Sequence, residues 1–191
     1  MQLPLFELPS DWRPPSLADM PSWSGAQRIA VDIETCDPNL RQTGPGVRTG
    51  GYMVGVSFAI EDGPCHYLPF RHELGDNLDE AQVLRYLRDQ ARAFKGTVVG
   101  ANLNYDLDYL AEAGVTFPNV EWQRDVQIAD PLINELHDSY SLERCALRNG
   151  LPGKDETQLL QAANHYGVDP KSGLWKLPGR HVGPYAEQDA R

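Results

Sequence analysis

The sequence has few cysteines, an excess of acidic over basic residues and no long apolar run. Its three cysteines (Cys36, Cys65 and Cys145) are odd in number and follow no pairing pattern. This argues against a disulfide framework or a zinc site and favours a reducing compartment. No apolar run approaches the roughly 20 residues of a membrane helix, and the N-terminus does not resemble a signal peptide. We therefore expect a cytoplasmic protein without a membrane partner.

The shortage of basic residues limits the partners that the chain can bind. It has 17 Lys and Arg against 27 Asp and Glu, which gives a net charge of −10. This charge argues against broad, non-specific binding of polyanions. It leaves room for an enzyme that holds a few nucleotides in a cleft whose metal ions supply the positive charge. The 191 residues and a hydrophobic content of 41% suit one globular core and not two.

The first 24 residues differ in composition from the rest of the chain. They contain five prolines and two tryptophans, Trp12 and Trp23. Proline fixes the backbone and removes a hydrogen-bond donor, so we expect an extended arm whose aromatic side chains pack on the domain or on a neighbour. We divide the chain into this arm, residues 1–24, and one domain, residues 25–191.

The remaining sequence predicts strands and helices in a mixed order. Period-2 alternation and short links predict an antiparallel meander of three strands, at residues 28–35, 52–60 and 65–70. A buried strand of the parallel type is expected at 97–101, and an edge strand within 115–126. Helices are predicted at residues 79–95, 103–113, 126–136, 141–149 and 156–166, with a last helix from about Pro184 and a loop over 36–51. This is the order of an α/β fold, a mixed β-sheet flanked by helices.

Two carboxylates share one face of the first predicted strand. Ile29, Val31 and Ile33 alternate with Asp32 and Glu34, so the two acidic side chains point the same way. Neighbouring carboxylates repel each other, and a fold tolerates this mainly when a cation lies between them. The alternative is a strand face that is simply exposed to solvent.

A third acidic residue, Asp106, follows the buried strand. It lies in the first turns of the next predicted helix, three residues from Leu103 and four from Leu110, so it borders the core-facing stripe. Its alternative role is to interact with the dipole at the helix N-terminus. Asp108 points to another side of the helix, and we expect it to be solvated.

The end of the chain adds a tyrosine and a fourth acidic residue. Tyr185 and Asp189 are four residues apart, so on a helix they project from the same side. Glu187 points away from them, and we expect it to be a surface charge. The alternative for Tyr185 and Asp189 is an ordinary surface pair.

These residues form three short motifs that resemble those of the DEDD superfamily of 3′–5′ exonucleases. The motifs are Asp32-Ile33-Glu34-Thr35, Asn102-Leu103-Asn104-Tyr105-Asp106 and Tyr185-Ala186-Glu187-Gln188-Asp189. Over about residues 28–191 the chain is similar to the proofreading domain of family A DNA polymerases, which include DNA polymerase I and phage relatives. A tyrosine four residues before the last Asp is typical of the tyrosine-type branch. We therefore interpret His181 as a loop residue and not a catalytic one.

The resemblance implies a ribonuclease H-like fold and a site for two divalent metal ions, Mg²⁺ or Mn²⁺. Asp32, Glu34 and Asp189 would hold one ion, with Asp32 bridging to the second, and Asp106 would act mainly through the second. Such hard cations prefer oxygen ligands, and a pair of them can stabilise both the attacking and the leaving oxygen at a phosphorus. Tyr185 would orient the attacking water, because a tyrosine with a pKa of about 10 is a poor base.

The resemblance also implies the substrate and the protein partner. The enzyme would bind a single-stranded 3′ end of DNA, release nucleoside 5′-monophosphates and proofread during replication in a bacterium or a phage-infected cell. Thr35 and Asn102 match positions near the terminal nucleotide. The partner would be a polymerase domain, in the same chain or in a separate one. Because Asp189 lies close to Arg191 and terminal turns fray, we expect the natural polypeptide to continue.

Two other functions stay open at this point. An RNA exonuclease of the RNase D type shares the fold and the three motifs, although residues 54–61 and 99–106 look more like the polymerase family. A silent domain kept for DNA binding or support would usually lack some of the carboxylates, and all four are present here.

Other charged residues have two possible roles. Asp125 also fits the family's pattern, but we expect it to cap a helix. Basic residues gather near the C-terminus, either along the path of the nucleic-acid strand or as solvated loop charges (Lys154, Lys171, Lys176, Arg180 and His181).

Overall fold

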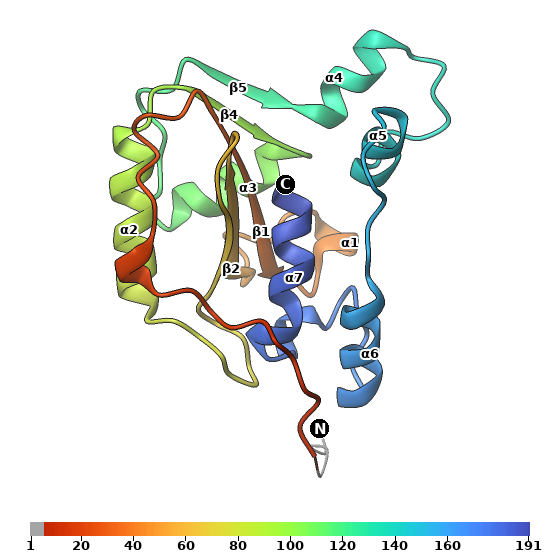
Figure 1. Cartoon of the computed structure of the whole chain (residues 1–191). Helices are drawn as coiled ribbons and strands as arrows, with labels where there is room; N and C mark the ends of the chain where they lie inside the picture. The colour runs from red at the N-terminus through yellow and green to blue at the C-terminus, as the bar shows by residue number, and fades with distance from the viewer. Residues whose placement is uncertain (1–5) are drawn as a thin grey trace.

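A mixed β-sheet with the strand order β3-β2-β1-β4-β5 lies at the centre of the computed structural model (Figure 1). The structure describes residues 6–191. β1 pairs antiparallel with β2, and β2 with β3, whereas β1–β4 and β4–β5 are parallel. The strands are β1 (Arg28–Cys36), β2 (Tyr52–Ile60), β3 (Cys65–Pro69), β4 (Thr97–Gly100) and β5 (Trp122–Asp125). The predicted α/β fold, an antiparallel meander extended by parallel strands, is confirmed.

Helices cover the two faces of this sheet. α2 and α3 supply side chains to the large hydrophobic core on one face, and α7 contacts β1, β2 and β3 from the other (Figure 1). The helices are α1 (Leu40–Thr43), α2 (Glu80–Ala93), α3 (Leu103–Glu112), α4 (Val126–Ile133), α5 (Leu142–Arg148), α6 (Thr157–Tyr166) and α7 (Gly179–Ala190), with 3₁₀ turns η1 (Leu17–Asp19) and η2 (Leu174–Lys176). Of the helices in residues 6–191, none is long and apolar enough to cross a membrane. α1 corrects the expectation of a continuous loop in this stretch.

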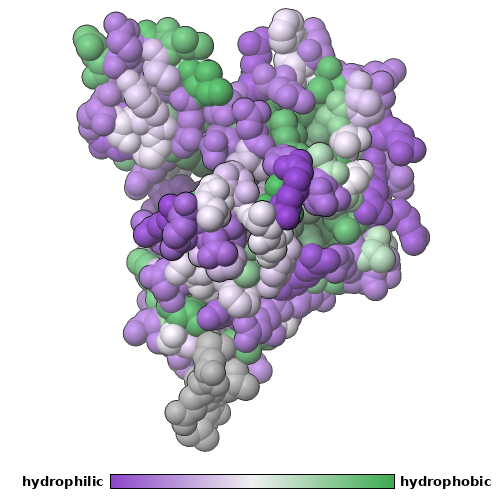
Figure 2. Space-filling view, turned by 180° about the vertical axis from the view of Figure 1, so that it is seen from behind, coloured by the Kyte–Doolittle hydropathy of each residue, from purple (hydrophilic) through white to green (hydrophobic). Residues whose placement is uncertain are grey.

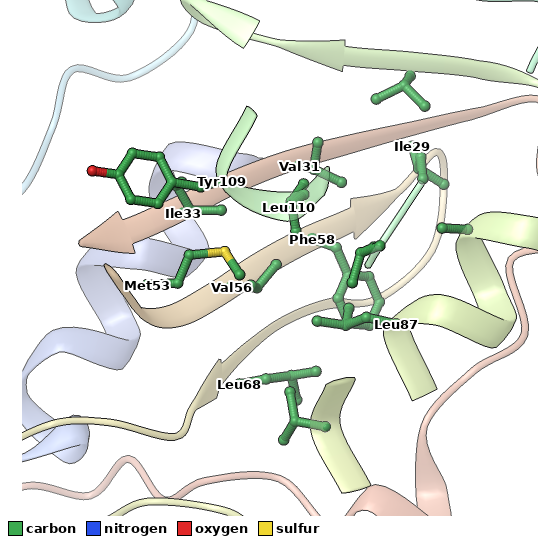
Figure 3. Packing of buried hydrophobic residues seen from close by; sticks show 14 of the residues in the cluster. Ile29, Val31, Ile33, Met53, Val56, Phe58, Leu68, Leu87, Tyr109 and Leu110 are labelled. Carbon is green, nitrogen blue, oxygen red and sulfur yellow. The ribbon is translucent and has the colours of Figure 1, made fainter. Parts of the chain in front are cut away.

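The alternation of β1 separates the core from the polar face of the sheet. Ile29, Val31 and Ile33 belong to the core cluster that α2 and α3 complete with Leu87 and Leu110 (Figure 3). All five are at most 7% exposed. Since successive strand residues point to opposite faces, the two acidic residues of β1 point toward α7. A slip of one residue would place carboxylates in the core, so the register of β1 is fixed by burial.

Asp125 is confirmed as the predicted helix cap. Its carboxylate accepts a hydrogen bond from Gln127 N at 2.8 Å, in the first turn of α4. It also accepts from Asn102 N at 3.1 Å and Leu103 N at 2.8 Å, at the start of α3. One side chain therefore caps two helices, and it holds the end of α3 that carries Asp106.

The last turn of α4 and the turn that follows it leave apolar side chains in solvent. Leu132, Ile133 and Leu136 are 82%, 82% and 85% exposed. Figure 2 shows hydrophobic surface at the tip of the part of the molecule that α4 and α5 form. The predicted helix end at residue 136 is wrong, because the chain turns at Asn134, whose side chain accepts a hydrogen bond from Leu136 N at 3.0 Å.

The N-terminal arm contributes Trp23 to the main core. This side chain is 1% exposed. Its ring stacks on Phe117, with centroids 6.3 Å apart and planes at 5°, and lies 5.1 Å from the ring of Phe58 on β2. The arm therefore packs its aromatic residue on the domain itself, which is one of the two arrangements that the sequence predicts.

α7 begins at Gly179 and contains Pro184, so the predicted start near Pro184 is wrong. Proline has no N–H and cannot donate to the carbonyl four residues back, which is that of Arg180. Ser10 Oγ from the arm donates to Arg180 O at 3.0 Å. A distant part of the chain thus supplies the missing hydrogen bond, which local sequence patterns do not indicate.

We predict that Trp23→Ala lowers the free energy of unfolding by about 3–5 kcal/mol, because it leaves a large cavity in the core. Equilibrium denaturation in urea measures this change. Trp122→Ala is the matched control: Trp122 is 53% exposed, and its loss should change the stability by at most about 0.5 kcal/mol. Equal losses in the two variants would contradict a core role for the arm.

Candidate active site

β1 presents the first two predicted site residues, Asp32 and Glu34, on the face of the sheet that α7 covers. The β1–β2 ladder shifts its register directly after Glu34, and such bulges often lie next to functional sites. Burial raises the pKa of both carboxyls well above the usual range. The charges of Asp106 and Asp189 raise the pKa of Asp32 further. The sequence-predicted residues therefore lie close enough to repel one another.

α3 brings Asp106 to the same place. Asn102, with a φ of +58°, leads the chain from the end of β4 into α3. Asp106 is 4% exposed, and its Oδ1 accepts a hydrogen bond from Ile33 N at 3.0 Å. β4 pairs with β1 only as far as Ala30, so this carboxylate satisfies a β1 N–H beyond the end of that ladder. Burial raises the pKa of Asp106 to about 7.

α7 supplies Asp189 and Tyr185. The side chain of Asp189 is 8% exposed and pairs with Lys154, whose Nζ lies 2.6 Å from Oδ1 and 2.7 Å from Oδ2. The same Nζ lies 3.4 Å from the Tyr185 hydroxyl oxygen. Burial raises the pKa of Tyr185 well above its usual value, and the charges of Glu34 and Asp189 add to this. The hydroxyl therefore stays protonated at neutral pH.

The donor set fits a hard divalent cation in its chemistry. All four carboxylates offer oxygen ligands, and their mutual repulsion is relieved by positive charge. The Lys154 ammonium on Asp189 is such a charge, and it lowers the pKa of Asp32 and of Glu34. As the side chains are placed, no three Asp, Glu, His or Cys residues within 6–191 converge closely enough to hold a metal ion. Ion binding would therefore require the carboxylates to turn toward one another.

The two predicted substrate-contacting residues lie at the ends of β1 and β4. Thr35 Oγ1 is 2.9 Å from the Tyr105 hydroxyl oxygen on α3. Asn102 precedes α3 and does not cap it with its side chain. Its side chain is thus not occupied by a capping hydrogen bond. A role for these two residues in binding a nucleotide remains a prediction.

Two sequence expectations about α7 are wrong. Glu187, expected to be a surface charge, accepts hydrogen bonds from Trp12 Nε1 and from Tyr67 N, both at 3.1 Å. His181, expected in a loop, lies in the first turn of α7, is 4% exposed and packs near the Tyr166 ring, 5.8 Å between centroids. The error for His181 follows from the earlier start of α7, which turns a predicted loop into a buried first turn. The error for Glu187 arises because its partners come from distant parts of the chain, the arm and β3.

Other charged residues behave as separate pairs. Asp108 is paired with Arg48 at 2.7 Å on the surface, as expected for a solvated residue. Arg180 binds Asp76 at 3.3 Å, so it is neither a free loop charge nor directed to the carboxylates. Of the basic residues that gather near the C-terminus, Lys154 joins the site. No spacing pattern reveals this, because Lys154 lies in the irregular segment between α5 and α6.

Two of the carboxylates border an open cavity of about 500 Å³. Asp32 and Asp189 form part of its wall, together with residues of β4, α4 and α5 that are mostly apolar. The hollow lies between the sheet, the end of α7 and the α4–α5 region. The site is therefore accessible from solvent on this side.

Solved structures with the same architecture place the chain in a structural class. It matches Brucella melitensis NrnC bound to pGG with a TM-score of 0.51 and 17% identity, over 90% of this chain and 71% of that one. It matches a structure described as the apo form of the nuclease with a TM-score of 0.53 and 20% identity, over 88% of this chain and 67% of that one. The fold is the ribonuclease H-like fold of these proteins.

The relatives in sequence are DNA polymerases. The chain is 57% identical over 194 residues to the DNA-directed DNA polymerase of Pseudomonas phage M6, covering 100% of this chain and 29% of the polymerase. It is 26% identical over 173 residues to DNA polymerase I of Pseudomonas aeruginosa, covering 86% of this chain and 17% of that protein. The resemblance to DNA polymerase I and its phage relatives is thereby confirmed. The chain spans less than a third of the length of these two relatives, and no protein-family model matches it.

The buried carboxylates predict that stability falls as pH rises in buffer that contains a chelator. The pKa of Asp106 is raised from 3.8 to about 7, so the folded state keeps a proton that the unfolded chain has released. The stabilisation that the protonated Asp106 carboxyl gives to the folded state is complete below about pH 4 and is lost as the pH rises through about 7. Between about pH 5 and 8, wild type should lose about 2 kcal/mol more stability than Asp106→Asn, as measured by urea denaturation. A parallel pH dependence of the two proteins would contradict this.

Proposed function

We propose that this chain is a metal-dependent 3′–5′ exonuclease that removes nucleotides from the 3′ end of DNA as nucleoside 5′-monophosphates. The observation that carries this proposal is the set of four carboxylates, buried or half-buried, that β1, α3 and α7 contribute. Their charges act on one another beside a protonated tyrosine. Similarity to a phage DNA polymerase over the whole chain supports it. Fold alone would not, because one fold serves many chemistries.

The carboxylates are the proposed metal ligands. Asp32, Glu34 and Asp189 would hold one divalent ion, with Asp32 shared, and Asp106 would act mainly through the second; both ions are Mg²⁺ or Mn²⁺. When bound, the two ions supply the positive charge that stabilises the attacking and leaving oxygens at phosphorus. Burial raises the pKa of Asp32 and of Glu34. The same low-dielectric surroundings strengthen the attraction of these two carboxylates for a cation.

The remaining residues orient the reactants. Tyr185 keeps its proton and donates a hydrogen bond, so it would hold the attacking water without deprotonating it. Thr35 and Asn102 would contact the terminal nucleotide of a single-stranded 3′ end. Proofreading during DNA replication follows if a polymerase domain, in the same chain or in a separate one, delivers that end to the site.

We predict that the protein shortens DNA stepwise from the 3′ end when Mg²⁺ or Mn²⁺ is present and not in EDTA. The substrates are single-stranded, 3′-recessed and mismatched DNA with a label at the 5′ end. Asp32→Ala and Asp189→Asn should each slow the reaction at least about 100-fold, since they remove transition-state stabilisation worth several kcal/mol. Asp108→Asn, on the surface pair with Arg48, is the matched control and should keep wild-type activity.

The same assay distinguishes the proposed DNA exonuclease from an RNase D-like RNA exonuclease and from a catalytically silent domain. Labelled RNA is included because an RNase D-like enzyme would shorten RNA and leave DNA intact. The dinucleotide pGG is included because one protein of the same fold was solved with it bound. If a folded sample shortens none of these substrates with either metal ion, the domain is silent and the proposal is wrong.

A further inference from the structure

We propose that Trp12 and Glu187 are positioning residues, which set the rotation of α7 so that Tyr185 and Asp189 face β1. The contact links the N-terminal arm, the active-site helix and the edge of the sheet. This inference rests on the function proposed above, because it concerns how that site is held in shape. Trp12 lies outside the three motifs, and Glu187 lies within the third but was expected to be only a surface charge.

α7 has two opposite stripes with different tasks. Successive residues of a helix are turned by about 100°, so residues two positions apart point to nearly opposite sides. Gly183 and Glu187 form one stripe, four residues apart. Tyr185 and Asp189 form the other, which faces the carboxylates of β1. Whatever holds the first stripe therefore fixes the direction of the second.

The ring of Trp12 lies directly on the first stripe. A Cβ at position 183 would collide with the Trp12 indole, so the ring reaches the helix backbone only because Gly183 has no side chain. The ring also lies 6.2 Å, centroid to centroid, from the ring of Tyr67 on β3. The indole is therefore held between α7 and the edge strand of the sheet.

Glu187 ties the same three elements by hydrogen bonds. Its Oε1 accepts from Trp12 Nε1 in the arm and from Tyr67 N, both at 3.1 Å. β3 is an edge strand, and this contact gives an acceptor to one of its backbone N–H groups. Cys65 Sγ also donates to the Glu187 carbonyl oxygen at 3.0 Å. A carboxylate shared by two donors from different elements leaves α7 little freedom to turn.

The arm holds α7 again one turn earlier. Ser10 Oγ occupies the Arg180 carbonyl that Pro184 leaves without a helical N–H, and Glu7 pairs with the Arg180 guanidinium at 3.1 Å. Without these contacts α7 would still be packed, because Val182 and Ala186 are fully buried in the core below it. The arm is therefore expected to affect the orientation of the helix more than its existence.

The experiment compares variants of Trp12 in the full chain. Because a misplacement of about 1 Å can cost about 100-fold in rate, Trp12→Ala should lower kcat about 100-fold and weaken Mn²⁺ binding about 10-fold, measured by electron paramagnetic resonance. Trp12→Phe, which keeps a ring and loses the N–H, should lower kcat about 10-fold with KM for DNA unchanged. Trp122→Phe is the matched control, since Trp122 is 53% exposed.

Glu187 variants separate positioning from general stability. Glu187→Gln keeps the oxygen that accepts both hydrogen bonds and should retain wild-type kcat, whereas Glu187→Ala should lose activity as Trp12→Phe does. Trp12→Phe and Glu187→Ala both remove the hydrogen bond between Trp12 and Glu187. The double variant should therefore be no slower than Glu187→Ala alone. Thermal unfolding by circular dichroism gives the folded fraction by which each kcat is corrected.

The possible results lead to different conclusions. Wild-type kcat and Mn²⁺ affinity in folded Trp12→Ala would overturn the positioning role and leave the proposed exonuclease intact. So would losses of kcat that disappear after correction for the folded fraction, or strictly additive effects in the double variant. A wild-type protein that neither binds Mn²⁺ nor shortens DNA would overturn the proposed function, and the positioning role with it.

Discussion

Electrostatic repulsion among buried carboxylates is the constraint on which the rest of this structure depends. β1 must present Asp32 and Glu34 side by side, because its apolar alternate residues are fixed in the core. α3 and α7 each add one more carboxylate, and burial raises the pKa values of Asp32, Glu34 and Asp106 above their usual range. Such a cluster is unfavourable unless positive charge reaches it. Positive charge therefore stabilises this cluster, and the ammonium of Lys154, paired with Asp189, supplies one such charge.

Much of the fold could be predicted because the relevant signals are local. The alternation along β1, the cap at Asp125 and the helical spacing of apolar residues each depend on neighbours a few positions away. The start of α7 could not be predicted in this way. Pro184 is a local sign of a helix start, and the group that satisfies the Arg180 carbonyl in the longer helix, the hydroxyl of Ser10, lies far away in the sequence. Glu187 was misjudged for the same reason, since its partners come from the arm and from β3.

The candidate site shows the same division between local pattern and distant contact. The acidic residues and Tyr185 follow from period and from motif, and the structure places Asp32 and Asp189 in the wall of one cavity. Lys154 follows from neither, because an irregular segment carries no period. The two kinds of comparison also contribute differently: similarity of fold assigns the architecture, and similarity in sequence assigns the relation to DNA polymerases. The chemistry still depends on the side chains themselves.

The hydrogen bond between Ser10 and the Arg180 carbonyl has a consequence for how the domain folds. Its two partners are 170 positions apart, so closing it forms one of the longest loops in the chain, and contacts of large sequence separation are slow to form. The arm leaves the ribosome well before α7 exists. α7 therefore completes its hydrogen bonding only when the N-terminal arm has reached it. The helix that carries Tyr185 and Asp189 thus depends, for one of its backbone hydrogen bonds, on the two most distant parts of the described chain coming together.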